Sequence, residues 1–232
     1  MSHDDLVLES ADGARFAAFI ATPDEGCASC VVILPDVRGL HRFYEELALR
    51  FAERGHAAIA IDYFGRSAGV GRRGDDFEYP PHVQQTTEEG IQADVRAAVE
   101  RLRPSCRAVF TVGFCFGGRN SWLAAGAGHG LAGAIGFYGR PGPGRDGKPG
   151  PTSRAAEIDA PILALMGGAD DGIPPEDVEA FEQALAEADV EHEVVVYPGA
   201  PHSFFDRKQA EFADASEDAW RRTLAFVERH GA

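Results

Sequence analysis

The stretch Ala108-Val-Phe-Thr-Val-Gly-Phe-Cys-Phe-Gly-Gly118 decides how the rest of the chain is interpreted. Its apolar run predicts a buried strand, and the Ala-rich segment after it predicts a helix that continues to about Gly128. Between them, Gly113-x-Cys115-x-Gly117 resembles the G-x-S-x-G turn that exposes a nucleophile between a strand and a helix, with sulfur in place of oxygen. The alternative is a buried structural cysteine beside glycines that pack a helix closely.

Composition limits the class of protein. The chain has 232 residues, of which 44% are hydrophobic and 25% charged, as expected of one globular domain over residues 1–232. Its net charge of −15 argues against nucleic acid and anionic membranes as partners, because both require a basic face. The acidic N-terminus is unlike a signal peptide, and no apolar run is long enough to span a membrane, so we expect a cytoplasmic protein.

The four cysteines suggest no metal site and no cofactor. Cys27 and Cys30 form a C-x-x-C pair that precedes a predicted strand and has no second pair to complete a zinc site. Cys106 and Cys115 are separate positions farther along the chain. In a reducing cytoplasm all four are expected to be free thiols.

Apolar runs alternate with amphipathic segments along the chain. Strands are predicted at Leu6–Ser10, Arg15–Ile20, Cys30–Leu34, His56–Ile61, Ala108–Val112, Ala132–Phe137, Pro161–Met166 and His192–Tyr197. Helices are predicted from Arg42 to Gly55, from the capping box Thr86–Glu89 to Pro104, after the Cys115 turn, from Pro174-Pro175 and from Glu217. The pattern predicts an α/β fold: a mostly parallel sheet with helices on both faces and an antiparallel N-terminal hairpin.

Two predicted loops are unusually long. Tyr63–Val83 is rich in Gly, Arg and aromatic residues, and a loop of that length in a compact domain is more often functional than idle. Arg140–Pro151 is rich in Gly and Pro and is expected on the surface.

Three reactive residue types follow predicted strands in the order nucleophile, acid, histidine, which is the order of the α/β-hydrolase fold. Cys115 is the candidate nucleophile and His202 the candidate general base and acid. Asp170 is preferred over Asp171 as the orienting carboxylate, because it stands at the strand end while Asp171 suits a turn or a helix cap. For His202 the alternative is an ordinary surface-loop residue.

Backbone donors near the candidate nucleophile are expected to stabilise a developing oxyanion. The N–H of Phe116, directly after Cys115, is one candidate. The N–H of Val37, in the loop after Leu34, is the other.

Taken together, the chain resembles the dienelactone hydrolase (carboxymethylenebutenolidase) family of α/β hydrolases from about Leu34 to the final helix. The motifs that carry the resemblance are Leu34–Gly39, Asp62–Arg66, Gly113–Gly118, Met166–Asp170 and His202–Phe204. The resemblance implies a triad of Cys115, Asp170 and His202. It also implies that a carboxylate at the position of Asp36 restrains the resting thiol until substrate displaces it. Arg66, Arg207 and Ser203 are the implied substrate-binding residues.

Two departures from the family pattern concern substrate binding. The best-known members have Glu where this chain has Asp36, and they have a second arginine where it has Asp206, with Arg207 one place later. The leading hypothesis is a cysteine-dependent hydrolase of a small ester or lactone that acts through a thioester acyl-enzyme. The alternatives are a general carboxylesterase or thioesterase, and a non-catalytic binding protein on the same fold. We expect a monomer or small homo-oligomer whose partner is a small molecule.

Overall fold

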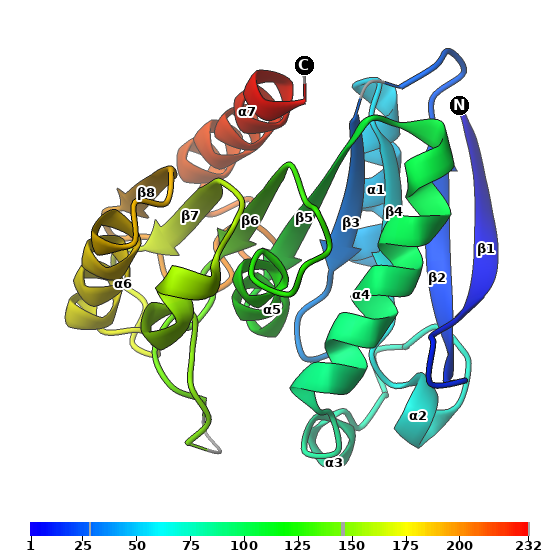
Figure 1. The fold of residues 1–232 in the computed structure, drawn as a ribbon, viewed down its shortest axis with the longest axis horizontal. Helices are drawn as coiled ribbons and strands as arrows, with labels where there is room; N and C mark the ends of the chain where they lie inside the picture. The colour runs from blue at the N-terminus through cyan, green and yellow to red at the C-terminus, as the bar shows by residue number, and fades with distance from the viewer. Residues whose placement is uncertain (28, 145–146, 232) are drawn as a thin grey trace. The chain divides into compact units, whose positions relative to one another are not determined.

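A computed structural model describes residues 1–27, 29–144 and 147–231, and its ribbon is drawn in Figure 1. The chain forms two compact units, residues 1–111 with Gly231 and residues 112–230, so the boundary falls inside strand β5 (Ala108–Phe114). The first unit contains β1 (Ser2–Glu9), β2 (Arg15–Thr22), β3 (Ser29–Leu34), α1 (Arg42–Glu53), β4 (Ala57–Ile61), α2 (Gly65–Ala68), α3 (Pro80–Val83), α4 (Glu88–Leu102) and the 3₁₀ helix η1 (Arg103–Ser105). The second contains α5 (Phe116–Ala124), β6 (Gly133–Phe137), the 3₁₀ helix η2 (Thr152–Glu157), β7 (Ile162–Gly167), α6 (Pro175–Glu187), β8 (His192–Tyr197) and α7 (Ala213–His230).

The first unit is a sheet in the order β1-β2-β4-β3. β1 pairs antiparallel with β2, and β2 pairs antiparallel with β4, whereas β3 and β4 are parallel. β3 and β4 are buried along their whole length, which explains why their sequences are continuous apolar runs rather than alternating ones. α1 and α4 cover opposite faces of these strands (Figure 1).

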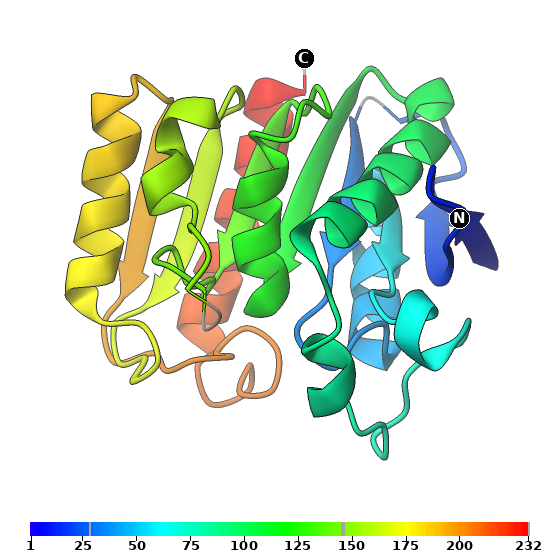
Figure 2. The ribbon, with the colours of Figure 1, turned by 60° about the horizontal axis from the view of Figure 1, so that its bottom comes forward.

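The second unit contains the parallel strands β6, β7 and β8, adjacent in that order. α5 packs on β6 and α6 on β8, while α7 packs on β6 and β7 from the other face (Figure 2). Cys115, Asp170 and His202 all follow the carboxyl ends of strands. The predicted α/β class, with its antiparallel N-terminal hairpin and helices on both faces, is confirmed.

Several predicted boundaries differ from the structure. α5 ends at Ala124 and turns follow it, so the helix is shorter than predicted. α7 begins at Ala213, four residues before Glu217, because Asp214 supplies the acidic first turn. The long loop after β4 contains the short helices α2 and α3.

The predicted surface loop Arg140–Pro151 is partly buried, at Pro141, Gly142, Gly150 and Pro151; its residues 145–146 lie outside the described part of the chain. The reason is the Arg119 side chain, which donates to the carbonyls of Arg140 (3.3 Å), Gly142 and Pro149 (2.9 Å) and holds the loop against α5.

The expectation of four free thiols is wrong. Cys30 and Cys106 form a disulfide, because Cys30 in β3 and Cys106 directly before β5 have Cα atoms 5.9 Å apart, within bridging range. The bond closes a loop with a sequence separation of 76 residues, which by chain-entropy arguments is worth roughly 4 kcal/mol. Cys27 and Cys115 remain free thiols. None of the described helices combines the length and apolar character needed to cross a lipid bilayer.

The predicted capping box Thr86–Glu89 is not formed at the start of α4, because the cap lies one residue later and the third helical position is then Gly90 rather than a Glu or Gln. The N-cap is Thr87, whose Oγ1 accepts a hydrogen bond from the Gly90 N–H at 3.1 Å. Thr86 instead donates its hydroxyl to Val83 O at 2.7 Å. Two adjacent threonines compete for the capping position, and pattern alone does not rank them. The core face of α4 has the spacing of an amphipathic helix: Ile91, Val95, Ala98, Val99 and Leu102 are all buried.

Thr87→Ala is expected to lower the free energy of unfolding by about 1 kcal/mol, because it leaves a donor of the first turn without its acceptor. Denaturant titration followed by circular dichroism measures this change. Thr87→Ser, which keeps the capping oxygen, is the matched control and should lie within about 0.5 kcal/mol of the wild type. Equal losses in both variants would contradict the assigned cap.

Candidate active site

Cys115 occupies the turn between β5 and α5 with a backbone conformation that side chains rarely adopt, φ 54° and ψ −111°. Its N–H donates to Phe137 O at 2.9 Å, and its carbonyl accepts from the Arg119 N–H at 3.2 Å. A Cβ at Gly113 would lie 2.0 Å from Gly117 O, so only glycine fits there. This strained elbow presents a partly exposed thiol.

His202 lies in the loop after β8 and is held by Asp170 at the end of β7. His202 Nδ1 is 2.6 Å from Asp170 Oδ2, and the other carboxylate oxygen accepts the Gly172 N–H at 2.9 Å. Asp170 is buried, whereas Asp171 is exposed. The Gly172 N–H therefore holds the carboxylate through Oδ1, and Oδ2 orients the imidazole of His202.

The Cys115 thiol interacts with the His202 imidazole and completes this arrangement. Burial of the imidazole opposes its charged form, but the hydrogen bonds to Asp170 and Cys115 outweigh burial and raise the pKa of His202 to about 10. The Tyr138 ring packs beside the imidazole, with the two ring centroids 5.0 Å apart. At neutral pH His202 is therefore an imidazolium placed between a sulfur and a buried carboxylate.

Phe116 is the first residue of α5, so its N–H lies at the positive end of the helix directly after Cys115. That is the position expected of an oxyanion donor.

The residues after His202 differ in exposure. Ser203 is buried and has a left-handed backbone, with φ 61°. The exposed Arg207 side chain reaches back to it, and Arg207 Nη2 donates to Ser203 Oγ at 3.1 Å. Asp206 accepts the Arg207 backbone N–H at 2.6 Å. A positive charge therefore lies beside the residue that follows His202.

In the first unit, Asp36 is buried and tied to Arg38. Arg38 Nε lies 3.1 and 3.0 Å from the two carboxylate oxygens, and Arg38 Nη2 lies 2.6 Å from Oδ2. The Asp36 N–H donates to Tyr44 Oη at 2.9 Å. Val37 is partly exposed within the same turn. The Asp36 carboxylate thus has a cationic partner, Arg38, that the sequence analysis did not predict.

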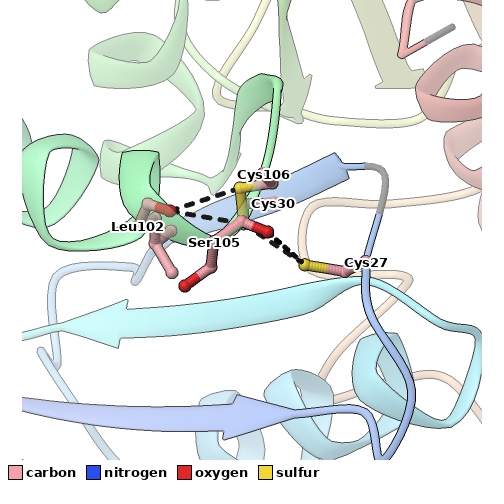
Figure 3. The surroundings of a disulfide bond; sticks show 5 residues. All are labelled: Cys27, Cys30, Leu102, Ser105 and Cys106. Carbon is pink, nitrogen blue, oxygen red and sulfur yellow. Dashed lines mark hydrogen bonds between the residues drawn. A yellow bond between two sulfur atoms is a disulfide. The ribbon is translucent and has the colours of Figure 1, made fainter.

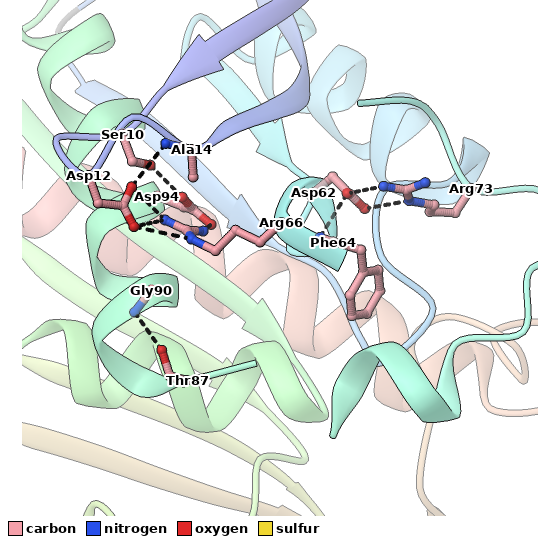
Figure 4. Close-up of polar contacts among 10 residues, drawn as sticks. All are labelled: Ser10, Asp12, Ala14, Asp62, Phe64, Arg66, Arg73, Thr87, Gly90 and Asp94. Atoms are coloured by element: carbon pink, nitrogen blue, oxygen red, sulfur yellow. Dashed lines mark hydrogen bonds and ion pairs between the residues drawn. The ribbon is translucent and has the colours of Figure 1, made fainter. Parts of the chain in front are cut away.

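Arg66 is held by two carboxylates of the first unit, as Figure 4 shows. Its Nη1 lies 2.5 Å from Asp94 Oδ2, and its Nη2 lies 2.9 Å from Asp12 Oδ2. Ser10 donates its hydroxyl to the other oxygen of Asp94. Burial raises the pKa of Asp94, and the hydrogen bonds from Arg66 and Ser10 oppose that rise. Arg66 therefore joins the hairpin turn to α4. Its predicted part in substrate binding stays a prediction.

A second buried ion pair fixes the loop after β4 (Figure 4). Arg73 Nη2 lies 2.8 Å from Asp62 Oδ2, and both side chains are buried. Asp62 also accepts the backbone N–H groups of Leu40 (3.2 Å) and Phe64 (2.9 Å). The length of this loop is thus explained in part by structural contacts.

Within the described residues, the grouping that could offer three or more metal ligands is Cys27, Cys30 and Cys106, whose sulfurs lie within 4.8 Å of one another. Two of these sulfurs are joined in the disulfide, so the cluster offers one thiol in this state.

Comparison with known proteins identifies the family. The profile of the Dienelactone hydrolase family matches residues 16–231. The chain belongs to the dienelactone hydrolase family. A carboxymethylenebutenolidase of Rhodococcus opacus is 32% identical, over 90% of this chain and 84% of that protein. A provisionally named carboxymethylenebutenolidase of Escherichia coli (strain K12) is 31% identical, over 94% of this chain and 84% of that protein.

A solved structure supports the same assignment. The crystal structure of a provisionally named dienelactone hydrolase from Klebsiella pneumoniae aligns with a TM-score of 0.85 and 28% identity, over 98% of this chain and 99% of that one. The predicted α/β-hydrolase fold and the predicted class of enzyme, a hydrolase of esters or lactones, are confirmed.

Sequence reasoning missed three side chains that determine the surroundings of the candidate residues: Arg38, Asp94 and Tyr138. Asp94 lies three residues after Ile91 on the buried face of α4, so a lone carboxylate on an apolar stripe was a usable signal. Arg38 is only two residues from Asp36 and could have been proposed as its partner. Tyr138 carried no sequence signal, since its contact with His202 depends on how β6 and β8 are arranged.

Asp170→Asn is expected to lower the pKa of His202 from about 10 toward its ordinary value, because a neutral amide no longer favours the imidazolium. Titration of the imidazole Cε1–H signal by NMR measures this shift, with His202→Gln used to assign the resonance. Asp171→Asn, at the exposed neighbour, should leave the titration in place. An unchanged His202 titration in Asp170→Asn would refute the proposed pairing.

Proposed function

We propose that the protein hydrolyses a small carboxylic ester or lactone through a cysteine nucleophile, with Cys115, His202 and Asp170 as its triad. The observation that carries this proposal is the 2.6 Å contact between His202 Nδ1 and Asp170 Oδ2, together with the interaction between the Cys115 thiol and the same imidazole. These residues lie at an elbow and two strand ends of the second unit. Membership of the dienelactone hydrolase family supports the same chemistry.

In the first step the Cys115 thiolate attacks the substrate carbonyl carbon, and a carbon–sulfur bond forms while the carbonyl oxygen becomes an oxyanion. The oxyanion is held by the Phe116 N–H at the start of α5. The tetrahedral intermediate then expels the alcohol or enol oxygen, and the His202 imidazolium gives it a proton. The raised pKa of His202 suits this order of events, since the acid is already protonated.

In the second step the thioester is hydrolysed. His202 is now neutral and takes a proton from water, whose oxygen attacks the thioester carbonyl. Collapse of the second tetrahedral intermediate releases the carboxylic acid and returns Cys115 as a thiolate. The buried Asp170 carboxylate keeps the imidazole oriented throughout. The expected contributions of Val37 as second oxyanion donor and of Asp36 as a restraint on Cys115 stay predictions.

The class of substrate depends on the arginines. A carboxylated lactone such as dienelactone needs a cationic partner, and Arg207 beside Ser203 is our candidate. A general carboxylesterase for neutral esters is the second candidate function. It is favoured by the engagement of Arg66 with Asp12 and Asp94, which already neutralise its charge.

The continuous family match over residues 16–231 also supports the proposal that residues 1–232 act as one domain. Assembly as a monomer or a small homo-oligomer stays a prediction.

Cys115→Ala is expected to reduce kcat for p-nitrophenyl acetate at least about 1000-fold, because loss of a nucleophile removes the covalent pathway. Initial-rate kinetics with a stopped-flow burst measurement checks this result. Cys27→Ser is the matched control, since it removes the other free thiol and should retain wild-type turnover. Full activity and a full burst in Cys115→Ala would refute the thioester mechanism.

Arg207→Ala is expected to raise KM for dienelactone about tenfold and to leave KM for p-nitrophenyl acetate unchanged, because only the first substrate carries a carboxylate. Lys208→Ala removes the neighbouring exposed charge and serves as the control. If Arg207→Ala and Lys208→Ala behave alike with both substrates, the neutral-ester function is favoured over the carboxylated lactone.

A further inference from the structure

Three cysteines of the first unit meet at the start of β3 and of β5, as Figure 3 shows. Cys30 and Cys106 are joined in a disulfide, and the free thiol of Cys27 lies with its sulfur 3.8 Å from that of Cys30. All three sulfurs lie within 4.8 Å of one another. A thiol in contact with a disulfide can exchange with it once the attacking, central and leaving sulfurs come into line.

We propose that Cys27, Cys30 and Cys106 form a thiol–disulfide exchange site that is separate from the hydrolytic chemistry. The Cys27 thiolate attacks Cys30 Sγ, the Cys27–Cys30 bond forms, and the Cys30–Cys106 bond breaks. Cys106 leaves as a thiolate and takes up the proton that Cys27 released to solvent. One disulfide and one thiol are present before and after the step, so no external oxidant or reductant is needed.

Burial and spacing make Cys30 the shared sulfur. Its side chain is completely buried, whereas Cys27 and Cys106 are partly exposed, so the two exchanging positions are the ones that solvent and small thiols reach. The C-x-x-C spacing of Cys27 and Cys30 allows the second disulfide to close a short loop.

A carbonyl oxygen is already placed for the free thiol in each state. Cys27 Sγ lies 3.3 Å from Ser105 O, which accepts its thiol proton before exchange. Cys106 Sγ lies 3.4 Å from Leu102 O, which can accept the proton of the thiol released by exchange. Both carbonyls belong to the end of α4 and to η1, where helix carbonyls lack helical partners.

Exchange changes the covalent connectivity of the first unit. The Cys30–Cys106 bond links segments separated by 76 residues, whereas Cys27–Cys30 links positions three apart. The Cys30–Cys106 cross-link would thus be released while the number of disulfides in the protein stays the same. Exchange therefore replaces a cross-link that closes a long loop by one that closes a short loop, and the longer loop is the one whose closure stabilises the folded state more.

The test follows the position of the free thiol in the oxidised wild-type protein. Samples held at pH 6.5 and pH 8.5 are quenched in acid, denatured, labelled with N-ethylmaleimide and mapped by peptide mass spectrometry. Cys115, the other free thiol, is the internal reference for complete labelling. We expect label at Cys106 as well as Cys27, and we expect exchange to be faster at pH 8.5 because the thiolate attacks.

Two variants separate exchange from simple reduction. Cys27→Ser lacks the attacking thiol and should show at least about tenfold less label at Cys106 than the wild type. Cys106→Ser should form the Cys27–Cys30 disulfide when treated with oxidised glutathione. Label confined to Cys27 in the wild type at pH 8.5, or equal labelling of Cys106 in the wild type and Cys27→Ser, would overturn the proposal.

Discussion

The close crossing of backbone at Gly113 and Gly117 is the constraint on which the second unit depends. The Gly117 carbonyl approaches so closely that Gly113 cannot carry a Cβ, and a Cβ at Gly118 would lie 2.7 Å from Phe137 O. This proximity lets α5 begin directly after β5 and lets Cys115 bond to the neighbouring strand. The unusual backbone of Cys115 is therefore a consequence of how closely the strand and helix pack, and it places the sulfur at the helix N-terminus.

The charge of His202 in the second unit is stabilised by two neighbouring groups rather than by a single partner. The buried Asp170 carboxylate favours a charged imidazole, and the hydrogen bond to Cys115 favours the same state from the other side. Burial alone would have had the opposite effect, so the hydrogen-bond partners decide the protonation state of His202. The first unit applies a similar rule, because its buried Asp62 and Asp94 each have an arginine.

Local pattern predicted most of the fold. Apolar runs identified β3, β4 and β8 closely, and the Pro174-Pro175 pair identified the start of α6. The order of Cys115, Asp170 and His202 was also readable, since parallel strands bring their carboxyl ends to one edge. Helix ends were less predictable because neighbouring residues compete for caps, as Thr86 and Thr87 do.

Contacts between distant segments could not be read from the chain. The partners of Arg66 come from a hairpin turn and from α4, and only the folded first unit brings Asp12 and Asp94 to one guanidinium. The disulfide depends likewise on where β3 and β5 begin. The sequence shows four cysteines but not that Cys30 and Cys106 come within bonding distance.

The edge strand β1 has a consequence for how copies of the chain meet. It ends the sheet of the first unit, and its residues from Ser2 to Asp5 are exposed, including the adjacent Asp4 and Asp5. An unpaired edge is a template for aggregation by strand addition. Asp5 is paired with Arg72, whose Nη2 lies 2.5 Å from Asp5 Oδ1. Two copies pairing through this edge would each still bring an exposed Asp4 and a net charge of −15, so electrostatic repulsion protects the edge that hydrogen bonding leaves open.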